Sequence, residues 1–320
     1  MCYSALVWSD YRTYVRDFNA RISIKEFYDL FYRRLSDPKI SVPKAIEAWF
    51  SNPTNDDERQ VKELIDRFAA QQQLEFEQRL FQQRTRLANA ERKLQTKTTD
   101  AALNDQRIAT NKIRQIMGWI DDLKRTELRE DDSRIYPMHY VPVIVLEDGQ
   151  RVVKPMRYQC LPAGKAFEND RKFPGTYNAR RDSLNRYWKT TFGTSHGVML
   201  ATKFFENVET HRMEGRELRP GEKVSNTVLE FQPRGLPLMV VACLWSQWTG
   251  PEIPDGLLSF AAITDEPPAE VSAAGHDRCI VPIRAENLDA WLQPNAADLN
   301  ASYAVLDDRE RPYYEHRLAA

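Results

Sequence analysis

The distribution of glycine and proline is the feature that most limits how this chain can fold. Residues 1–117 contain no glycine, and eleven of the twelve glycines lie between Gly149 and Gly275. No proline occurs between Asn55 and Tyr136. Because glycine and proline mark turns and interrupt helices, this distribution predicts a helical first part and a second part made of strands and loops.

The proline-free window predicts two long antiparallel helices that form a hairpin over residues about 55–134. Its residues are good helix formers, and apolar side chains recur at helical, coiled-coil-like spacing. Asn55 precedes three acidic residues, which is typical of a helix start, and residues 96–100 predict the turn. Sixteen acidic and sixteen basic residues balance between Asp56 and Arg134, so binding of DNA by charge alone is not expected. The hairpin is then either a structural projection or an arm for an unknown protein partner.

Residues 136–320 predict a mostly antiparallel sheet or barrel with helices around it, because short apolar runs alternate with turn residues. Asp148-Gly149 predicts a tight turn between two of these runs. The further strand candidates are His196–Glu206, Val224–Gln232, Leu238–Leu244, Leu257–Thr264 and Arg278–Ile283. Short helices are predicted at Lys25–Leu35, Pro43–Phe50 and Arg284–Leu292.

The composition is that of a soluble globular protein, with 42% hydrophobic and 28% charged residues. A net charge of −1 excludes global electrostatic capture of nucleic acid but allows a local basic groove. The four cysteines lack the close paired spacing of a zinc site or disulfide framework, so we expect reduced thiols and neither a metal nor a cofactor. No apolar run reaches the roughly 18 residues of a membrane span, and no signal peptide is present. We expect a cytoplasmic protein without a membrane partner.

Gly275-His276-Asp277-Arg278 precedes an apolar, strand-like run and contains ionisable residues on a glycine turn. Histidine changes charge near neutral pH, and a glycine beside it leaves the imidazole ring accessible. These properties favour a role in proton transfer. The alternative is a structural histidine that only forms hydrogen bonds.

Cys2 follows the initiator methionine directly, and it is small enough for Met1 to be removed. Removal would leave a thiol and a free α-amine on one residue, with ordinary pKa values of about 8.5 and about 8. Either group would be partly deprotonated near neutral pH, and an N-terminal nucleophile can use its own amine as a base. The alternative is a cysteine without a function at a frayed chain end.

Two further stretches carry possible chemistry. Residues 165–189 hold seven basic and three acidic residues with five aromatic residues between them, a pattern typical of grooves for single-stranded nucleic acid. Phe204-Phe205-Glu206 places a carboxyl group among apolar side chains, which favours a raised pKa and acid–base work. The alternatives are a solvated loop for the first stretch and an acid that points into water for the second.

Four motifs, taken together and in order, resemble those of the SOS-response-associated peptidases. The motifs are Met1-Cys2, Asn178-Ala179-Arg180 with Asp182 and Ser183, Phe204-Phe205-Glu206-Asn207, and Gly275-His276-Asp277-Arg278. The resemblance covers residues 1–10 and about 136–295. It therefore divides the chain into an N-terminal catalytic strand at 1–18, a helical insertion at 19–135 that contains the hairpin, and a core at 136–320.

The resemblance implies an α+β fold with a curved, mostly antiparallel, barrel-like sheet, flanking helices and the inserted long helical hairpin. It also implies an enzyme that senses abasic sites in single-stranded DNA and forms a covalent thiazolidine crosslink through Cys2, after a peptidase-like self-cleavage removes Met1. In this assignment Cys2 is the nucleophile, Asn178 holds the cysteine amine, and Glu206 and His276 transfer protons. The implied DNA-binding residues are Arg180, Arg181, Arg278 and Lys172.

The chain departs from the family pattern near the nucleophile. Cys2-Tyr3-Ser4 stands where most members have Cys-Gly-Arg, and Glu206-Asn207 stands where they have Glu-Trp, so one phosphate contact and one stacking residue are missing. Two other functions stay open: a thiol peptidase acting on protein through Cys2 and His276, or a non-catalytic interaction protein with the same fold.

Overall fold

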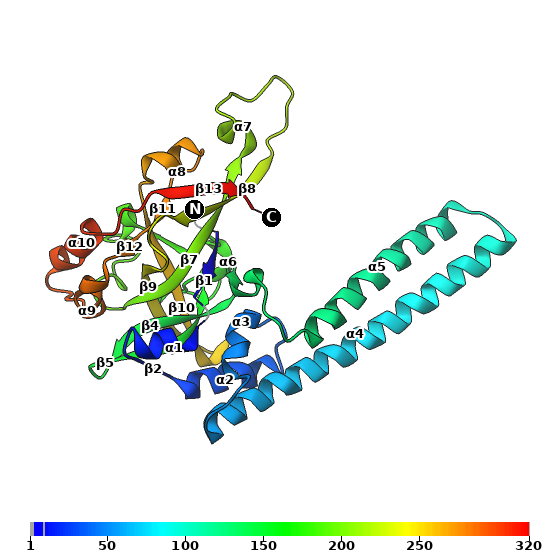
Figure 1. Cartoon of the computed structure of the whole chain (residues 1–320), viewed down its shortest axis with the longest axis horizontal. Coiled ribbons are helices and arrows are strands. Elements are labelled where there is room, and N and C mark those ends of the chain that lie inside the picture. The colour runs from blue at the N-terminus through cyan, green and yellow to red at the C-terminus, as the bar shows by residue number, and fades with distance from the viewer. Residues whose placement is uncertain (1–2, 9, 320) are drawn as a thin grey trace.

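The computed structural model describes residues 3–8 and 10–319, and it confirms a mixed α+β fold. Its described strands form one 13-stranded sheet, and its helices lie around the sheet and in a projecting hairpin (Figure 1). The strands are β1 (Ser4–Val7), β2 (Ala20–Ile22), β3 (Arg134–Ile135), β4 (Tyr140–Glu147), β5 (Gln150–Tyr158), β6 (Asn178–Arg180), β7 (His196–Glu209), β8 (Asn226–Pro233), β9 (Met239–Gly250), β10 (Ile253–Asp265), β11 (Cys279–Ile280), β12 (Pro282–Ile283) and β13 (Tyr314–Leu318).

The helices confirm the expected order, with a helical first part and a second part made of strands, because the two longest helices come before most of the strands in the sequence. The α-helices are α1 (Tyr11–Arg16), α2 (Ile24–Arg34), α3 (Lys44–Glu47), α4 (Asp56–Thr96), α5 (Asp100–Lys124), α6 (Asn169–Lys172), α7 (Thr210–Met213), α8 (Ala269–Ala273), α9 (Leu288–Leu292) and α10 (Leu299–Asp307). The short 3-10 helices are η1 (Ala48–Phe50), η2 (Glu130–Ser133), η3 (Arg181–Ser183) and η4 (Ala285–Asn287). Among the described residues, no helix is both long and apolar enough to cross a membrane.

The sheet is mostly antiparallel, as predicted, and the main path of strand pairing runs from β12 to β3 without forming a closed barrel. Only β2 and β6 and the β5–β10 contact add parallel pairings among the described strands. β4 and β5 form the predicted hairpin, in which Asp148 and Gly149 take the positive φ angles of 49° and 75° that such a two-residue turn needs. The long strand β7 is central, because it pairs with β1, β4, β8 and β9.

The predicted helical hairpin consists of α4 and α5, which project together from the body of the protein (Figure 1). The side chain of Asn55 accepts a hydrogen bond of 2.9 Å from the Glu58 backbone and so caps α4. The two helices pack through small buried side chains, such as Ala90 and Ala109, which let their backbones come close. Arg86 and Asp105 add an ion pair of 2.5 Å between them.

The base of the hairpin belongs to the hydrophobic core. Val61 and Leu64 of α4 are buried in the main core cluster, where α4 packs against α2. The guanidinium group of Arg34 in α2 lies 4.0 Å from the centre of the Phe68 ring. The hairpin is therefore anchored by apolar packing at its base, whereas its distal part contacts only itself.

Candidate active site

Glu206 lies near the end of β7 and is fully buried. β7 carries β1 along one edge, with Ser4 opposite Phe205, and β8 along the other. The backbone of Tyr3 forms a hydrogen bond with the Glu206 carboxyl group. Burial raises the pKa of Glu206 to about 8, so this carboxyl group holds its proton at neutral pH. Tyr3, the first described residue, thus contacts the protonated carboxyl group of Glu206.

His276 is brought to Glu206 by the turn that follows α8. Its Nε2 lies 3.2 Å from Oε2 of Glu206, and its ring is mostly buried. Nδ1 lies 2.8 Å from the carbonyl oxygen of Arg278. Burial lowers the pKa of His276, so the imidazole is neutral near pH 7.

The two pKa shifts assign the protons in this pair. Nδ1 of His276 faces the Arg278 carbonyl oxygen at 2.8 Å and also accepts from the Arg278 backbone N–H at 3.3 Å, while Nε2 faces Oε2 of Glu206. At neutral pH the two shifts favour a protonated carboxyl group beside a neutral imidazole. Neighbouring groups whose pKa values are shifted in opposite directions are typical of acid–base pairs in active sites.

Gly275 makes the position of His276 possible. Its φ of +94° is a conformation that side chains disfavour, and a Cβ atom there would lie 2.8 Å from Val208 Cγ1 and 3.1 Å from Arg212 Cβ. The turn therefore packs directly against the junction of β7 and α7. Any larger residue would push the imidazole away from the strand that carries Glu206.

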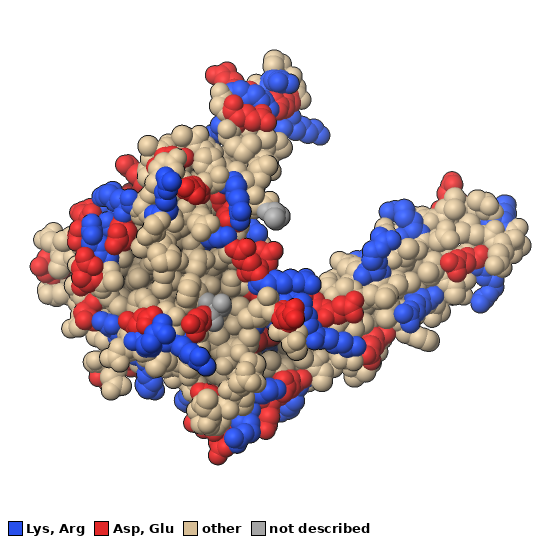
Figure 2. All heavy atoms as spheres, viewed as in Figure 1, with Lys and Arg blue, Asp and Glu red and all other residues tan. Residues whose placement is uncertain are grey.

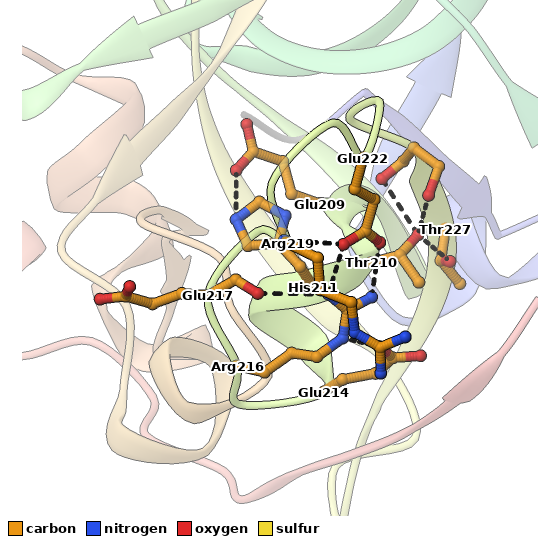
Figure 3. Close-up of polar contacts among 10 residues, drawn as sticks. Glu209, Thr210, His211, Glu214, Arg216, Glu217, Arg219, Glu222 and Thr227 are labelled. Carbon is orange, nitrogen blue, oxygen red and sulfur yellow. Dashed lines mark hydrogen bonds and ion pairs between the residues drawn. The ribbon is translucent and has the colours of Figure 1, made fainter.

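The segment beyond β7 is held by a polar network at its tip (Figure 3). Arg216 binds both carboxylate oxygens of Glu222, at 2.8 and 2.7 Å, and Glu214 at 2.5 Å. Thr210 contacts the hydroxyl group of Thr227 on β8 at 2.9 Å. These contacts hold the segment that follows β7, and Gly275 packs against the start of this segment at Val208 and Arg212.

Asn178 lies on β6, opposite Ala262 of β10. Its side chain is buried, and neither amide atom has a hydrogen-bond partner among the described residues. A buried amide without partners costs about 1–3 kcal/mol, so Asn178 is prepared to bind a polar group. Cys2, the expected nucleophile, lies outside the described residues.

Arg180 and Arg278, predicted as DNA contacts, converge on one carboxylate. Arg180 Nη2 lies 2.6 Å from Asp182 Oδ2, and Arg278 Nη2 lies 3.3 Å from the same oxygen. The hydrogen bond from Arg180 lowers the pKa of Asp182 below its ordinary value. Two cations share this carboxylate, and Asp277 adds a second negative charge that acts on both Arg180 and His276, so the cluster carries no net charge.

The other two predicted DNA contacts lie in different surroundings. Arg181 forms ion pairs with Asp265 at 3.2 Å and Asp307 at 2.5 Å. Lys172 is exposed at the end of α6. Within the basic segment Tyr177 and Trp188 are buried in the core, whereas Phe173 is 49% exposed.

Arg134 packs against β1 and β7, and the sequence did not single it out. Its Nε donates a hydrogen bond of 3.4 Å to Ser4 Oγ, and its guanidinium group lies 3.7 Å from the centre of the Phe205 ring. Arg134 reaches this place because β3 pairs with β1, with Arg134 opposite Leu6. β1 and β3 lie on either side of the helical hairpin in the sequence, and their pairing leaves no local pattern in the sequence. The position of Arg134 is therefore visible only in the folded structure.

Residues 93–318 match the family model described as SOS response associated peptidase (SRAP). This chain belongs to the SRAP family. The SRAP match includes Asn178, Glu206 and His276, and it leaves residues 1–92, and therefore Cys2, outside. Among the described residues, no group of three or more His, Cys, Asp or Glu side chains is arranged to hold a metal ion.

Three solved structures similar to this SRAP protein have low sequence identity. A protein from Bacteroides thetaiotaomicron is 13% identical, with a TM-score of 0.47, over 62% of this chain and 82% of that chain. A protein from Bordetella bronchiseptica is 16% identical, with a TM-score of 0.46, over 61% and 90%. A phage-related protein from the same organism is 18% identical, with a TM-score of 0.42, over 58% and 81%. No curated protein sequence gives a significant match.

Proposed function

We propose that this SRAP family protein recognises abasic sites in single-stranded DNA and forms a covalent thiazolidine crosslink through Cys2, after removal of Met1. The observation that supports this proposal most is the buried Glu206–His276 pair, 3.2 Å apart, beside the start of the described chain. The pair offers one proton donor and one proton acceptor at the same pH. An acid and a base together are what condensation of an amine with an aldehyde requires.

The proposed reaction needs no oxidant, reductant or cofactor. The Cys2 amine attacks the aldehyde carbon of an opened abasic sugar, the carbonyl oxygen leaves as water, and an imine forms. The Cys2 sulfur then adds to the imine carbon while the thiol proton passes to the nitrogen, which closes a five-membered ring. One aldehyde and one N-terminal cysteine thus give one thiazolidine and one water.

The described residues fit separate steps of this reaction. Protonated Glu206 donates a proton to the departing oxygen, and neutral His276 accepts a proton from the amine or thiol. The buried amide of Asn178, which has no partner among the described residues, holds the amine in place through a hydrogen bond. Hydrolysis of the Met1–Cys2 peptide bond, which exposes that amine, is the associated peptidase-like activity and draws on the same acid and base.

The DNA strand would bind over Arg180 and Arg278, whose guanidinium groups can donate hydrogen bonds to phosphate oxygens. Lys172 and Arg181 extend the proposed surface. Figure 2 shows positive and negative side chains interspersed along the hairpin of α4 and α5, so this arm offers no basic stripe on the face in view. The arm suits a protein partner better than a nucleic acid.

The test is to incubate the purified protein with a single-stranded oligonucleotide that contains one abasic site, and to look for a shifted band under denaturing conditions. We expect an adduct with the parent protein and none with Cys2→Ala. The matched controls are Cys160→Ala, Cys243→Ala and Cys279→Ala, because these thiols are buried and burial raises their pKa values, that of Cys160 to about 12. An adduct from Cys2→Ala at the parent yield would contradict the proposal. Cysteine-dependent cleavage of peptides without any DNA adduct would favour the thiol peptidase instead.

A further inference from the structure

The face of α4 that points away from α5 is open to solvent. Leu74 and Phe81 lie seven residues apart and so share this face, and their side chains are 58% and 73% exposed. Ala90, which is buried where α4 packs on α5, lies roughly two and a half helical turns from Phe81 and therefore on the opposite side. The exposed side chains that continue the open face are Gln78, Thr85 and Ala88. These five exposed residues form what we call the outer seam of α4.

Phe81 gives the outer seam an apolar centre. It is the most exposed large apolar side chain among the described residues. Single exposed apolar residues are ordinary on protein surfaces. Here Leu74 and Phe81 follow each other at the seven-residue spacing with which a helix packs against another helix.

Charge is divided unequally along α4. Residues 56–78 contain seven acidic and three basic residues, whereas residues 79–96 contain one acidic and five basic residues. The half near the body therefore carries four net negative charges and the distal half four net positive ones. Two α4 helices side by side in antiparallel orientation would each place their positive half on the negative half of the other. In parallel orientation, like charges would face each other.

Glu77 and Arg84 lie beside the outer seam, on either side of Phe81 in the sequence. Both side chains are exposed, and neither forms an ion pair within the part of the chain that the structure describes. The residues three and four positions away from them are all uncharged, namely Gln73, Leu74, Leu80, Phe81, Leu87 and Ala88. Neighbours at these spacings are the ones that could pair with them on the same helix. Partners for both charges therefore have to come from outside α4.

We propose that two copies of this chain associate through the outer seams of their α4 helices, antiparallel and with Phe81 at the two-fold axis. In this arrangement Glu77 of one copy lies level with Arg84 of the other, and the symmetry forms the same ion pair twice. Leu74 lies opposite Ala88 of the other copy. The inference goes beyond the proposed function and does not depend on it.

The charges of α4 favour a second copy over other partners. A nucleic acid or an acidic protein would be attracted to residues 79–96 but repelled by residues 56–78. A second copy supplies the opposite charge to both halves at once. It also covers Phe81 with an apolar side chain.

The experiment measures self-association of the full chain by sedimentation over a range of protein concentrations. We expect the parent to approach twice its monomer mass as concentration rises. Glu77→Arg and Arg84→Glu each place like charges together twice, and each should raise the dimer dissociation constant about tenfold at low salt. The double variant Glu77→Arg with Arg84→Glu restores opposite charges and should return to the parent value. Added salt should reduce the differences among these proteins.

The matched control is Arg107→Glu, the same charge change at an exposed arginine of α5 whose guanidinium contacts Asn104. It should keep the parent dissociation constant. A parent that stays monomeric at every concentration would overturn the inference, and so would single reversals without effect or a double variant that is not restored. If a monomeric parent instead binds an intact oligonucleotide and Arg84→Glu does not, the distal half of α4 binds nucleic acid and the proposed dimer is wrong.

The orientation has a separate test in a Cys2→Ala background, where the remaining native cysteines are buried. Leu74→Cys mixed with Ala88→Cys should give a disulfide-linked dimer under mild oxidation, because the antiparallel pair places these two positions opposite each other. Leu74→Cys alone should not. Crosslinking of Leu74→Cys to itself, without crosslinking in the mixture, would show a parallel pair and overturn the proposed arrangement.

Discussion

His276 Nε2 lies 3.2 Å from Glu206 Oε2, although His276 follows α8 and Glu206 lies 70 residues earlier, in the central strand β7. Both side chains are buried, and burial shifts their pKa values in opposite directions toward the uncharged forms. At neutral pH these shifts favour an uncharged carboxyl group beside an uncharged imidazole over an ion pair. A site in this state can donate and accept a proton without first moving one to solvent.

Glu206→Gln and His276→Ala should each slow crosslinking to an abasic strand about 10²–10⁴-fold, the range typical of a positioned acid or base. Affinity for an intact strand should stay unchanged, because neither group is proposed to contact phosphate. The measurement is a time course at saturating oligonucleotide, with binding measured in parallel. Glu209→Gln is the control on the same strand, since it makes the same change in a carboxylate that pairs with Arg212 at 2.7 Å. Parent rates in both variants would remove the catalytic roles of the pair and leave the fold unaffected.

The stability of the protein should depend on pH through Glu206. Its pKa is raised from 4.5 to about 8 on folding, so the stabilisation from its neutral form is complete below pH 4.5 and is lost as pH rises through 8. His276, whose pKa is lowered, has the opposite sign: its contribution is present above pH 6.5 and is lost as pH falls through the folded value. Thermal unfolding from pH 5 to 9 should therefore show the parent losing stability relative to Glu206→Gln at the alkaline end. A constant difference between the two proteins would contradict a raised Glu206 pKa.

Gly275→Ala should destabilise the protein by about 1–3 kcal/mol from backbone strain alone, with a further loss from crowding against Val208. It should also slow crosslinking, because the turn that carries His276 would move. Gly215→Ala is the control, since Gly215 also has a positive φ, of 64°, but a Cβ atom there meets no atom within 4 Å. Thermal unfolding and adduct rates should be measured for both. Equal effects of the two changes would mean that the close contact at Gly275 does not position the histidine.

The distal hairpin should be removable without loss of the site. The Phe76 and Trp119 ring centres lie 5.3 Å apart, so a short Gly-Ser linker can replace residues 77–118. The removed residues pack within the hairpin, and the protein should keep its thermal stability and its crosslinking rate. A second deletion of residues 56–124 removes Val61 and Leu64 from the core and should prevent folding. Insoluble protein from the first deletion would show that the distal hairpin stabilises the body.

The helical hairpin, the Asp148-Gly149 turn and most of the strands were predictable from the sequence, because local periodicity and turn residues determine them. The Asn55 cap and the break before Asp100 belong to the same class of local signal. Glu206 and His276 were also predicted, from the residues around them, and Asn178 was predicted from a resemblance of motifs. Their catalytic roles stay predictions.

Only the tertiary structure could bring these residues together and set their chemistry. The apolar neighbours of Glu206 favoured a raised pKa, but the burial that raises the pKa of Glu206 and lowers that of His276 comes from packing between elements that are distant in sequence. The place of Arg134 follows from the pairing of β3 with β1 across more than a hundred residues of chain, which no local pattern predicts. The sequence by itself determined the helices, turns and candidate residues through short-range physics. The tertiary structure decided which charges meet, which stay unpaired and which groups lose their charge, because electrostatic energy depends on distance and solvent exposure in the folded chain.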